Sequence, residues 1–138
     1  MTKTQAETQL EQMEISPEVA RAIKKMGFES LTPIQEKCIP YMMRGSDVIA
    51  VAPTGTGKTI AYGIPLLEYV NLDDDRVQEV VMAPTRELAQ QIAAELKQLA
   101  QYIPRLRMAI IYGGQPISRQ ITALKCRPQL LIATPGRL

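Results

Sequence analysis

The sequence has 138 residues, of which 46% are hydrophobic and 22% are charged, a composition typical of one globular domain or part of one. It contains no histidine, which excludes Ser-His-Asp and Cys-His catalysis and zinc sites that use histidine. The two cysteines, Cys38 and Cys126, form no C-x-x-C pair and are expected to be reduced thiols that act as small hydrophobic residues. The apolar stretches are too short to cross a membrane and the polar amino terminus is no signal peptide, so we expect a cytoplasmic protein.

Charge is distributed unevenly along the chain. Residues 1–95 hold nine Lys or Arg and fourteen Asp or Glu, whereas residues 96–138 hold seven basic residues and no acidic one. This asymmetry indicates either a contact with a polyanion in the C-terminal part or an ordinary solvated basic surface. Charge alone favours the ordinary surface.

The amino-terminal third predicts a polar tail followed by two helices. Residues 1–9 lack an apolar stripe and are interpreted as a flexible tail. A helix is predicted over residues 16–27, which begin with an N-cap serine and end with a glycine. A second helix is predicted to begin at Thr32, which has capping-box spacing to Gln35, and Pro40 is expected to kink or end it.

From residue 47 onward, short apolar runs alternate with helical patterns. Buried strands are predicted at 47–52, 79–83, 107–112 and 129–133, because these runs are rich in β-branched residues. Helices are predicted at 58–69, 86–101 and 116–126, the last with Ile117, Ile121 and Leu124 on its apolar face. The alternation predicts an α/β fold in which a parallel sheet carries helices on both faces.

Ligands of such folds bind beyond the carboxyl ends of the strands, so the residues that follow each strand are candidates for function. All four strand exits carry glycine or proline together with small polar residues: Pro53–Gly55, Pro84–Arg86, Gly113–Gln115 and Thr134–Arg137. One such exit is ordinary turn chemistry. Four on the same edge of one sheet indicate a functional rim.

The first exit carries the strongest motif. Residues 52–59 read APTGTGKT, a phosphate-binding P-loop pattern with Ala52 in place of the usual first glycine. Gly55 and Gly57 allow successive N–H groups to face phosphate oxygens, Lys58 supplies a positive charge, and Thr59 offers a hydroxyl to Mg²⁺. A chance Gly-rich turn is disfavoured because a strand pattern precedes the loop and a helix pattern follows it. The predicted ATP-phosphate site comprises Pro53, Thr54, Gly55, Thr56, Gly57, Lys58 and Thr59, with Lys58 and Thr59 in the catalytic positions.

The P-loop and four further motifs, in order and spacing, resemble those of bacterial DEAD-box ATP-dependent RNA helicases. Phe28 with Thr32–Gln35 resembles the Q motif, Pro84–Leu88 motif Ia, Gly113–Gly114 the GG motif, and Thr134–Arg137 motif Ib. The resemblance extends from about residue 10 to the last residue and implies the first RecA-like domain of a P-loop NTPase. It divides the chain into a tail at 1–9, a Q-motif region at 10–36, and the first part of the ATP-binding domain at 37–138.

By this resemblance, Gln35 would read the edge of adenine and Phe28 would pack on the base. Helix capping alone would account for Gln35, and core packing alone would account for Phe28. Capping and adenine reading can coexist, because a side-chain amide has several donor and acceptor sites. The adenine role is favoured because Gln35 and Phe28 occur together before a P-loop. The remaining motifs would hold the RNA backbone without reading its sequence, through Pro84, Thr85, Arg86, Gly113, Gly114, Thr134, Pro135, Gly136 and Arg137. The implied ligands are ATP, Mg²⁺ and RNA, and the implied partner is a second RecA-like domain, with no membrane contact.

The chain departs from the family pattern in two respects. Leu10 or Met13 stands where the family usually has an upstream aromatic residue, and the 138 residues contain no DEAD tetrad. We therefore expect an incomplete domain without activity of its own, in which the 47–52 strand has an exposed apolar edge. Another P-loop NTPase, such as a DNA-directed helicase, and a non-catalytic nucleotide- or RNA-binding module remain as alternatives.

Overall fold

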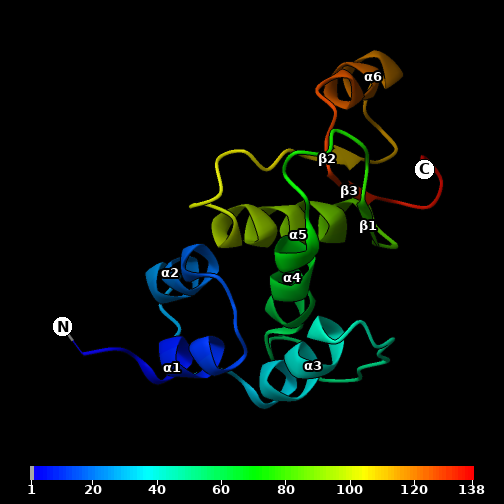
Figure 1. The fold of residues 1–138 in the computed structure, drawn as a ribbon. Helices are drawn as coiled ribbons and strands as arrows, with labels where there is room; N and C mark the ends of the chain where they lie inside the picture. The colour runs from blue at the N-terminus through cyan, green and yellow to red at the C-terminus, as the bar shows by residue number, and fades with distance from the viewer. Residues whose placement is uncertain (1) are drawn as a thin grey trace. The chain divides into compact units, whose positions relative to one another are not determined.

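A computed structural model describes residues 2–138, and within them the chain forms six helices and three strands (Figure 1). Two compact units divide the chain. The first unit extends to Tyr69 and includes Leu96–Ile103, and the second comprises Val70–Glu95 and Pro104–Leu138. None of the helices in the described residues is both long enough and apolar enough to cross a lipid bilayer. Cys38 is buried as expected, whereas Cys126 is exposed, and both are free thiols.

The first unit consists of helices. They are α1 (Gln5–Gln12), α2 (Pro17–Lys25), α3 (Pro33–Met43), α4 (Lys58–Tyr69) and the last turn of α5 (Arg86–Leu99). Gly63 lets α4 approach that last turn closely, because a Cβ there would lie 2.8 Å from Leu96 Cδ2. The largest fully buried aliphatic side chains of this unit are Leu10, Val19, Ile23, Ile39, Ile60, Ile64, Leu96 and Leu99.

The predicted tail at residues 1–9 is wrong for most of its length, because α1 occupies its second half, and Met1 lies outside the described residues. A capping box starts α1: the Thr4 N–H donates to Glu7 Oε2 at 2.7 Å, and the Glu7 N–H donates to Thr4 Oγ1 at 3.2 Å. Ala6 and Leu10 lie on one face of the helix and are both fully buried. The overlooked signal in the sequence is Thr4 followed three positions later by Glu7.

The two helices predicted from capping patterns are confirmed. α2 begins immediately after Ser16 and ends before Gly27, whose φ of 92° is accessible to glycine. α3 begins after Thr32, as the capping-box spacing predicts. Pro40 does not end α3, which continues to Met43, because proline lacks only its own N–H and the Arg44 N–H still donates to the Pro40 carbonyl at 3.3 Å.

The predicted strand at residues 47–52 is wrong, because this segment has no regular secondary structure. No strand in the described part of the chain pairs with it, and a strand is stable only when a neighbour satisfies its N–H and C=O groups. Its side chains nevertheless alternate as those of a strand would. Ile49 and Val51 are 98% and 92% exposed, whereas Val48 is 37% exposed and lines, with Ala50, a cavity beside α3 and α4.

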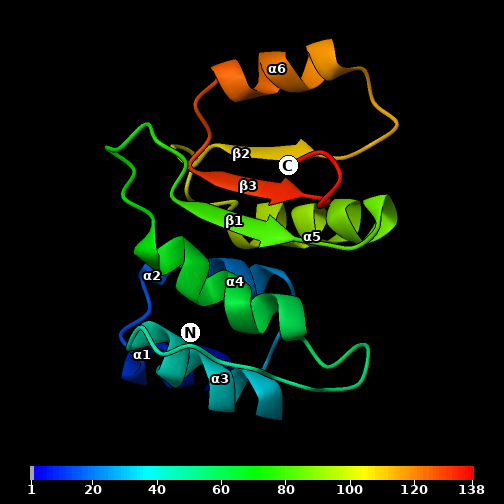
Figure 2. The ribbon, with the colours of Figure 1, turned by 90° about the vertical axis from the view of Figure 1, so that its right-hand side faces the viewer.

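The second unit contains the sheet. β1 (Glu79–Met82), β2 (Met108–Ile111) and β3 (Leu130–Ala133) are all parallel, in the order β1-β3-β2, and Figure 2 shows the three arrows side by side. The first part of α5 follows β1, and α6 (Ile117–Lys125) joins β2 to β3. These two crossovers traverse the sheet in opposite directions, so right-handed connections place α5 and α6 on opposite faces. The predicted α/β architecture is therefore confirmed for three of the four strands.

One face of the sheet packs against α6 through Ala123, over a cluster of Ala109, Ile111, Leu131 and Ala133. The predicted apolar face of α6 is not the face that packs on the sheet. Its residues Ile117, Ile121 and Leu124 are 62%, 48% and 39% exposed. Gln120 is buried in their place, where its amide finds hydrogen-bond partners. In the described chain nothing covers the outer side of this helix.

The acidic loop at residues 73–75 binds three of the seven C-terminal basic residues within the second unit. Arg105 pairs with Asp73 at 2.5 Å, while Arg107 and Arg127 pair with Asp75 at 3.1 and 3.3 Å. These exposed pairs give the ordinary explanation for much of the charge asymmetry. The basic segment as a whole therefore does not mark an anion site.

Candidate functional site

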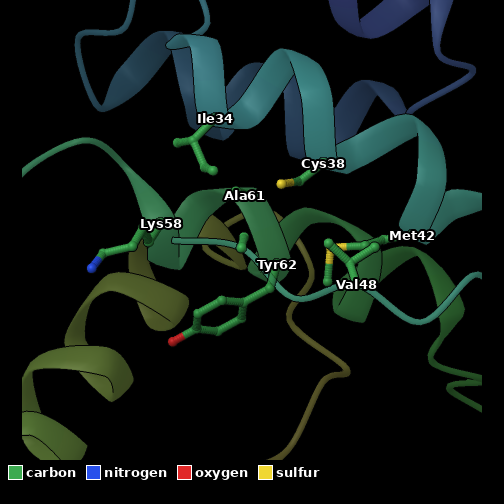
Figure 3. Close-up of a pocket in the computed structure, with 8 residues that line it drawn as sticks. Ile34, Cys38, Met42, Val48, Lys58, Ala61 and Tyr62 are labelled. Atoms are coloured by element: carbon green, nitrogen blue, oxygen red, sulfur yellow. The ribbon is translucent and has the colours of Figure 1, made fainter. Parts of the chain in front are cut away.

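The P-loop lies in the first unit, between the 47–52 segment and α4. Gly55 and Gly57 both have a φ of +82°, a left-handed conformation that side chains with a Cβ adopt at a cost. Lys58 is the first residue of α4, so the unpaired N–H groups of the first helical turn adjoin the loop. Figure 3 shows the Lys58 ammonium directed away from the neighbouring apolar side chains. The predicted loop and the helix that follows it are thus confirmed, although the strand before them is not.

Hydrogen bonds hold this loop in a closed turn. Lys58 Nζ donates to the carbonyl oxygen of Ala52 at 2.9 Å, and Thr56 Oγ1 donates to that of Pro53 at 2.7 Å. Lys58 is exposed, and Thr59 is half-buried. A single carbonyl is a weaker partner for an ammonium than a phosphate group, so Lys58 can exchange it for an anionic ligand.

Two side chains at the start of α3 donate hydrogen bonds to carbonyl groups of the P-loop. Gln35 is completely buried, and its Nε2 donates to the Gly57 carbonyl at 3.2 Å while its Oε1 accepts from the Thr32 N–H at 2.9 Å. Thr32 Oγ1 donates to the Thr56 carbonyl at 2.8 Å, a contact that the sequence pattern did not reveal. Both ends of the Gln35 amide are therefore engaged by protein, and each end keeps one further position for a hydrogen bond, the second N–H of Nε2 and the second lone pair of Oε1. Phe28, the other predicted adenine contact, is half-buried.

An apolar cavity of about 280 Å³ lies between α3, α4 and the 47–52 segment (Figure 3). Its lining residues are Ile34, Cys38, Met42, Val48, Ala50, Lys58, Ala61 and Tyr62. Phosphate requires convergent N–H donors or cations, which this lining largely lacks. The cavity is therefore a packing space beside the P-loop, and the candidate phosphate site is the loop itself.

In the second unit, the exits of the three parallel strands lie at one edge of the sheet. They place together Pro84–Arg86, Gly113–Gly114 and Thr134–Arg137, which we call the rim. The expectation of four exits on one sheet is wrong, because the 47–52 segment pairs with no strand and its exit belongs to the first unit. Thr85 starts α5, where its Oγ1 accepts from the Leu88 N–H at 3.2 Å.

Tyr112 connects the first two segments of the rim. The guanidinium of Arg86 lies 5.9 Å from the centroid of its ring, and its hydroxyl oxygen accepts from Gln90 Nε2 at 3.0 Å and from Gln115 Nε2 at 2.6 Å. A Cβ at Gly114, which has a φ of +88°, would lie 3.0 Å from Arg86 Nη1. The left-handed backbone at Gly114 therefore favours glycine where these segments approach each other.

Arg137 in the third segment is held by two acceptors. Its Nη1 donates to the Gln115 carbonyl and to Gln120 Oε1, both at 3.2 Å. Pro135 and Gly136 are exposed, and Thr134 is half-buried. The sequence did not identify Gln90, Tyr112, Gln115 or Gln120, because scattered neutral side chains form no motif.

Few acidic groups are placed for metal binding. In residues 2–138 no three His, Cys, Asp or Glu side chains gather in a way that would hold a metal ion. Glu79 lies at the amino end of β1, opposite the rim, and its buried Oε1 has no hydrogen-bond partner among the described residues. Burial raises the pKa of Glu79 to about 7.

A left-handed glycine loop ahead of a helix, together with a parallel sheet, is typical of P-loop α/β proteins. The sequence profile of the DEAD/DEAH box helicases matches residues 32–138. This match covers most of the chain, and the chain belongs to the DEAD/DEAH box helicase family.

Similar proteins agree with this assignment. The chain is 50% identical over 131 residues to the DEAD-box ATP-dependent RNA helicase CshA of Geobacillus kaustophilus, covering 95% of this chain and 28% of that protein. The CshA of Bacillus subtilis is 50% identical over 124 residues, which is 90% of this chain and 25% of that protein. The chain thus spans about a quarter of the length of the curated relatives it matches.

Solved structures show the same fold. A DEAD box protein from the hyperthermophile Methanococcus jannaschii superposes with a TM-score of 0.80 at 40% identity, over 89% of this chain and 33% of that one. The RNA helicase Prp28 from Chaetomium thermophilum, bound to ADP, superposes with a TM-score of 0.81 at 34% identity, over 91% of this chain and 32% of that one. The RecA-like fold is therefore shown, whereas the roles of individual residues remain predictions.

Proposed function

We propose that this chain supplies nucleotide- and RNA-binding elements of an ATP-dependent RNA helicase. The observation that carries the proposal is the P-loop, where Gly55 and Gly57 adopt left-handed conformations directly before Lys58 and Thr59 at the start of α4. The relatives named as ATP-dependent RNA helicases, and Prp28 with its bound ADP, support the same assignment.

The loop fits a nucleotide phosphate. A Cβ at Gly55 would meet no heavy atom within 4 Å, so there is open space beside the backbone of the turn. Lys58 would turn from the Ala52 carbonyl to the β- and γ-phosphates, and the N–H groups at the start of α4 would add partial positive charge. Pro53, Thr54 and Thr56 would complete the loop around the phosphates.

Thr59 is the residue of this chain that would hold Mg²⁺, and the nucleotide oxygens would provide further ligands. Mg²⁺ bound there would neutralise negative charge on the β- and γ-phosphates. Gln35 and Phe28 would bind adenine, which favours ATP over GTP. Gln35 would keep its contacts to Gly57 and Thr32 while binding the base, because Nε2 has a second N–H and Oε1 has a second lone pair.

The rim is proposed to bind the RNA backbone. Arg86 and Arg137 provide positive charge there, and Gly113 and Gly114 allow the chain of a sugar–phosphate ligand to approach closely. Contacts to phosphate position a strand without selecting its sequence. Hydrolysis and unwinding would require a second RecA-like domain as partner. A cytoplasmic location is part of the proposal, because ATP and RNA are both available to a protein in the cytoplasm.

Equilibrium titration of this chain with a fluorescent ATP analogue and Mg²⁺ tests the proposal. We expect binding that ATP displaces more effectively than GTP and that Lys58→Ala abolishes. Lys37→Ala, an exposed lysine on α3, is the matched control and should bind as the parent chain does. Equal binding by Lys58→Ala and the parent chain would contradict the assignment of the P-loop.

A further inference from the structure

Gln120 is a buried polar side chain in a helix whose apolar residues face outward. Only 3% of its surface is exposed, while Ile117 and Ile121 on the same helix are 62% and 48% exposed. Burying an amide is unfavourable unless both of its ends are hydrogen-bonded. The orientation of α6 therefore buries the Gln120 amide and leaves Ile117 and Ile121 exposed.

The partners of Gln120 come from two different segments at the rim. Its Nε2 donates to the carbonyl oxygen of Tyr112 at 2.6 Å, directly before Gly113 and Gly114. Its Oε1 accepts from Arg137 Nη1 at 3.2 Å. One amide thus ties the exit of β2 to the exit of β3.

The contacts of Arg137 leave much of its guanidinium available. Both of its hydrogen bonds, to Gln120 and to the Gln115 carbonyl, use Nη1. Nε and Nη2 make no hydrogen bond within residues 2–138. A guanidinium anchored by one nitrogen presents its remaining donors in a fixed plane, which suits the oxygens of a phosphate.

We propose that Gln120 is a positioning residue for RNA binding: it holds Arg137 and the Gly113–Gly114 turn in the arrangement that receives one backbone phosphate. Gln120 itself touches no RNA. The proposal rests on the proposed function, because it requires that the rim binds RNA. The alternative is that Gln120 only stabilises the second unit.

The salt dependence of RNA binding distinguishes positioning from general stabilisation. The logarithm of affinity falls with the logarithm of salt concentration by about 0.7 for each phosphate contact to a single strand. Loss of one contact therefore reduces this slope, whereas a uniform loss of stability does not. Because Gln120 would act through Arg137, removing both side chains should cost no more than removing Arg137.

The experiment measures binding of the complete protein that contains this chain to a labelled single-stranded oligouridine, with an ATP analogue and Mg²⁺, over a range of salt concentrations. The variants are Gln120→Met, Arg137→Gln and the double variant, with Gln91→Met as the matched control because Gln91 is exposed on α5. We expect each single variant to raise Kd about tenfold and to lower the slope by about 0.7, and the double variant to resemble Arg137→Gln. Gln91→Met should bind as the parent protein does.

Two other outcomes would contradict the proposal, each at a different step. A normal slope for Gln120→Met, when Arg137→Gln lowers it, would overturn the positioning role and leave RNA binding by the rim intact. A normal Kd and slope for Arg137→Gln would overturn both. Arg137→Lys keeps the charge and leaves the Gln120 side chain in place, so it remains informative if Gln120→Met does not fold. We expect it to raise Kd severalfold, and parent-like affinity would contradict the need for an anchored guanidinium.

Discussion

The side-chain amide of Gln35 donates a hydrogen bond of 3.2 Å to the main-chain carbonyl of Gly57. The same side chain accepts from the Thr32 N–H, so one buried glutamine both caps α3 and supports the P-loop. Helix capping and loop support are thus coupled through a single residue. We therefore expect a change at Gln35 to alter both the start of α3 and the conformation of the candidate phosphate site.

Replacing Gln35 with alanine should therefore affect stability as well as binding. The substitution removes the acceptor of the Thr32 N–H and one of the two donors to the Gly57 carbonyl, which also accepts from the Ala61 N–H at 3.1 Å. We expect a loss of about 1–3 kcal/mol in the free energy of unfolding, together with weaker binding of the ATP analogue. Chemical denaturation and titration measure the two effects. Lys37→Ala, on the exposed side of the same helix, should change neither, and parent-like stability of Gln35→Ala would argue against the coupling.

The two P-loop glycines should differ in their tolerance of alanine. Both have a φ of +82°, so alanine at either position costs about 1–2 kcal/mol in backbone strain. At Gly57 the new methyl group would also collide with the amide nitrogen of Gln35, whereas at Gly55 it would meet open space. We expect Gly57→Ala to lower the melting temperature more than Gly55→Ala does. Equal melting temperatures would mean that the Gln35 side chain moves aside without cost.

Glu79 should make stability depend on pH near neutrality. Burial raises the pKa of its carboxyl from 4.5 to about 7, so the folded chain keeps the proton that the unfolded chain loses. The stabilising contribution of the neutral form is complete below pH 4.5 and is lost as pH rises to about 7. The full shift corresponds to about 3 kcal/mol, and solvent screening of this half-buried group reduces it to about 1–2 kcal/mol.

The variant Glu79→Gln tests that linkage, because its amide remains neutral at every pH. At pH 8 it should be more stable than the parent chain by about 1–2 kcal/mol, and the difference should vanish near pH 4. Denaturant unfolding at both pH values measures this. A constant difference between the Glu79 variant and the parent chain across this range would contradict a raised pKa.

The 47–52 segment should expose apolar surface in solution. Ile49 and Val51 are almost completely exposed, so the paired substitution Ile49→Thr and Val51→Thr removes apolar area without removing β-branched side chains. We expect reduced binding of a hydrophobic dye and a higher temperature for the onset of aggregation. Val48→Thr, on the cavity side of the segment, should lower stability and should reduce dye binding less than the paired variant does, because Val48 is only 37% exposed. Equal dye binding by the paired variant and the parent chain would contradict the exposure.

Helix termini and three of the strands could be predicted from the sequence because their signals are local. Gly27 and the Thr32–Gln35 spacing specify helix ends within a few residues, and β-branched runs specify β1, β2 and β3. The 47–52 run carries the same local signal, yet it forms no strand because pairing depends on a neighbour distant in sequence. Strand pairing depends on the tertiary fold, so the pattern of apolar residues along the sequence does not predict it.

In the candidate sites, too, features with a local sequence signal could be predicted and features that depend on distant residues could not. The P-loop could be predicted because its chemistry requires particular residues at fixed spacing, with Gly57 and Lys58 adjacent. The supporting amides could not, because Gln35 and Gln120 obtain their roles from carbonyls that only the fold brings near. The buried face of α6 was assigned wrongly for a related reason: hydrogen bonding of Gln120 outweighs burial of Ile121.

The most direct test of the central claim, that the P-loop and the rim serve one ATP-dependent and RNA-directed activity, is ATP hydrolysis by the complete protein with and without single-stranded RNA. We predict that RNA accelerates hydrolysis severalfold, that Lys58→Ala abolishes it, and that Arg137→Gln raises the RNA concentration required for half-maximal stimulation. Hydrolysis that depends on Lys58 and does not respond to RNA would contradict the claim and identify a P-loop ATPase of another kind.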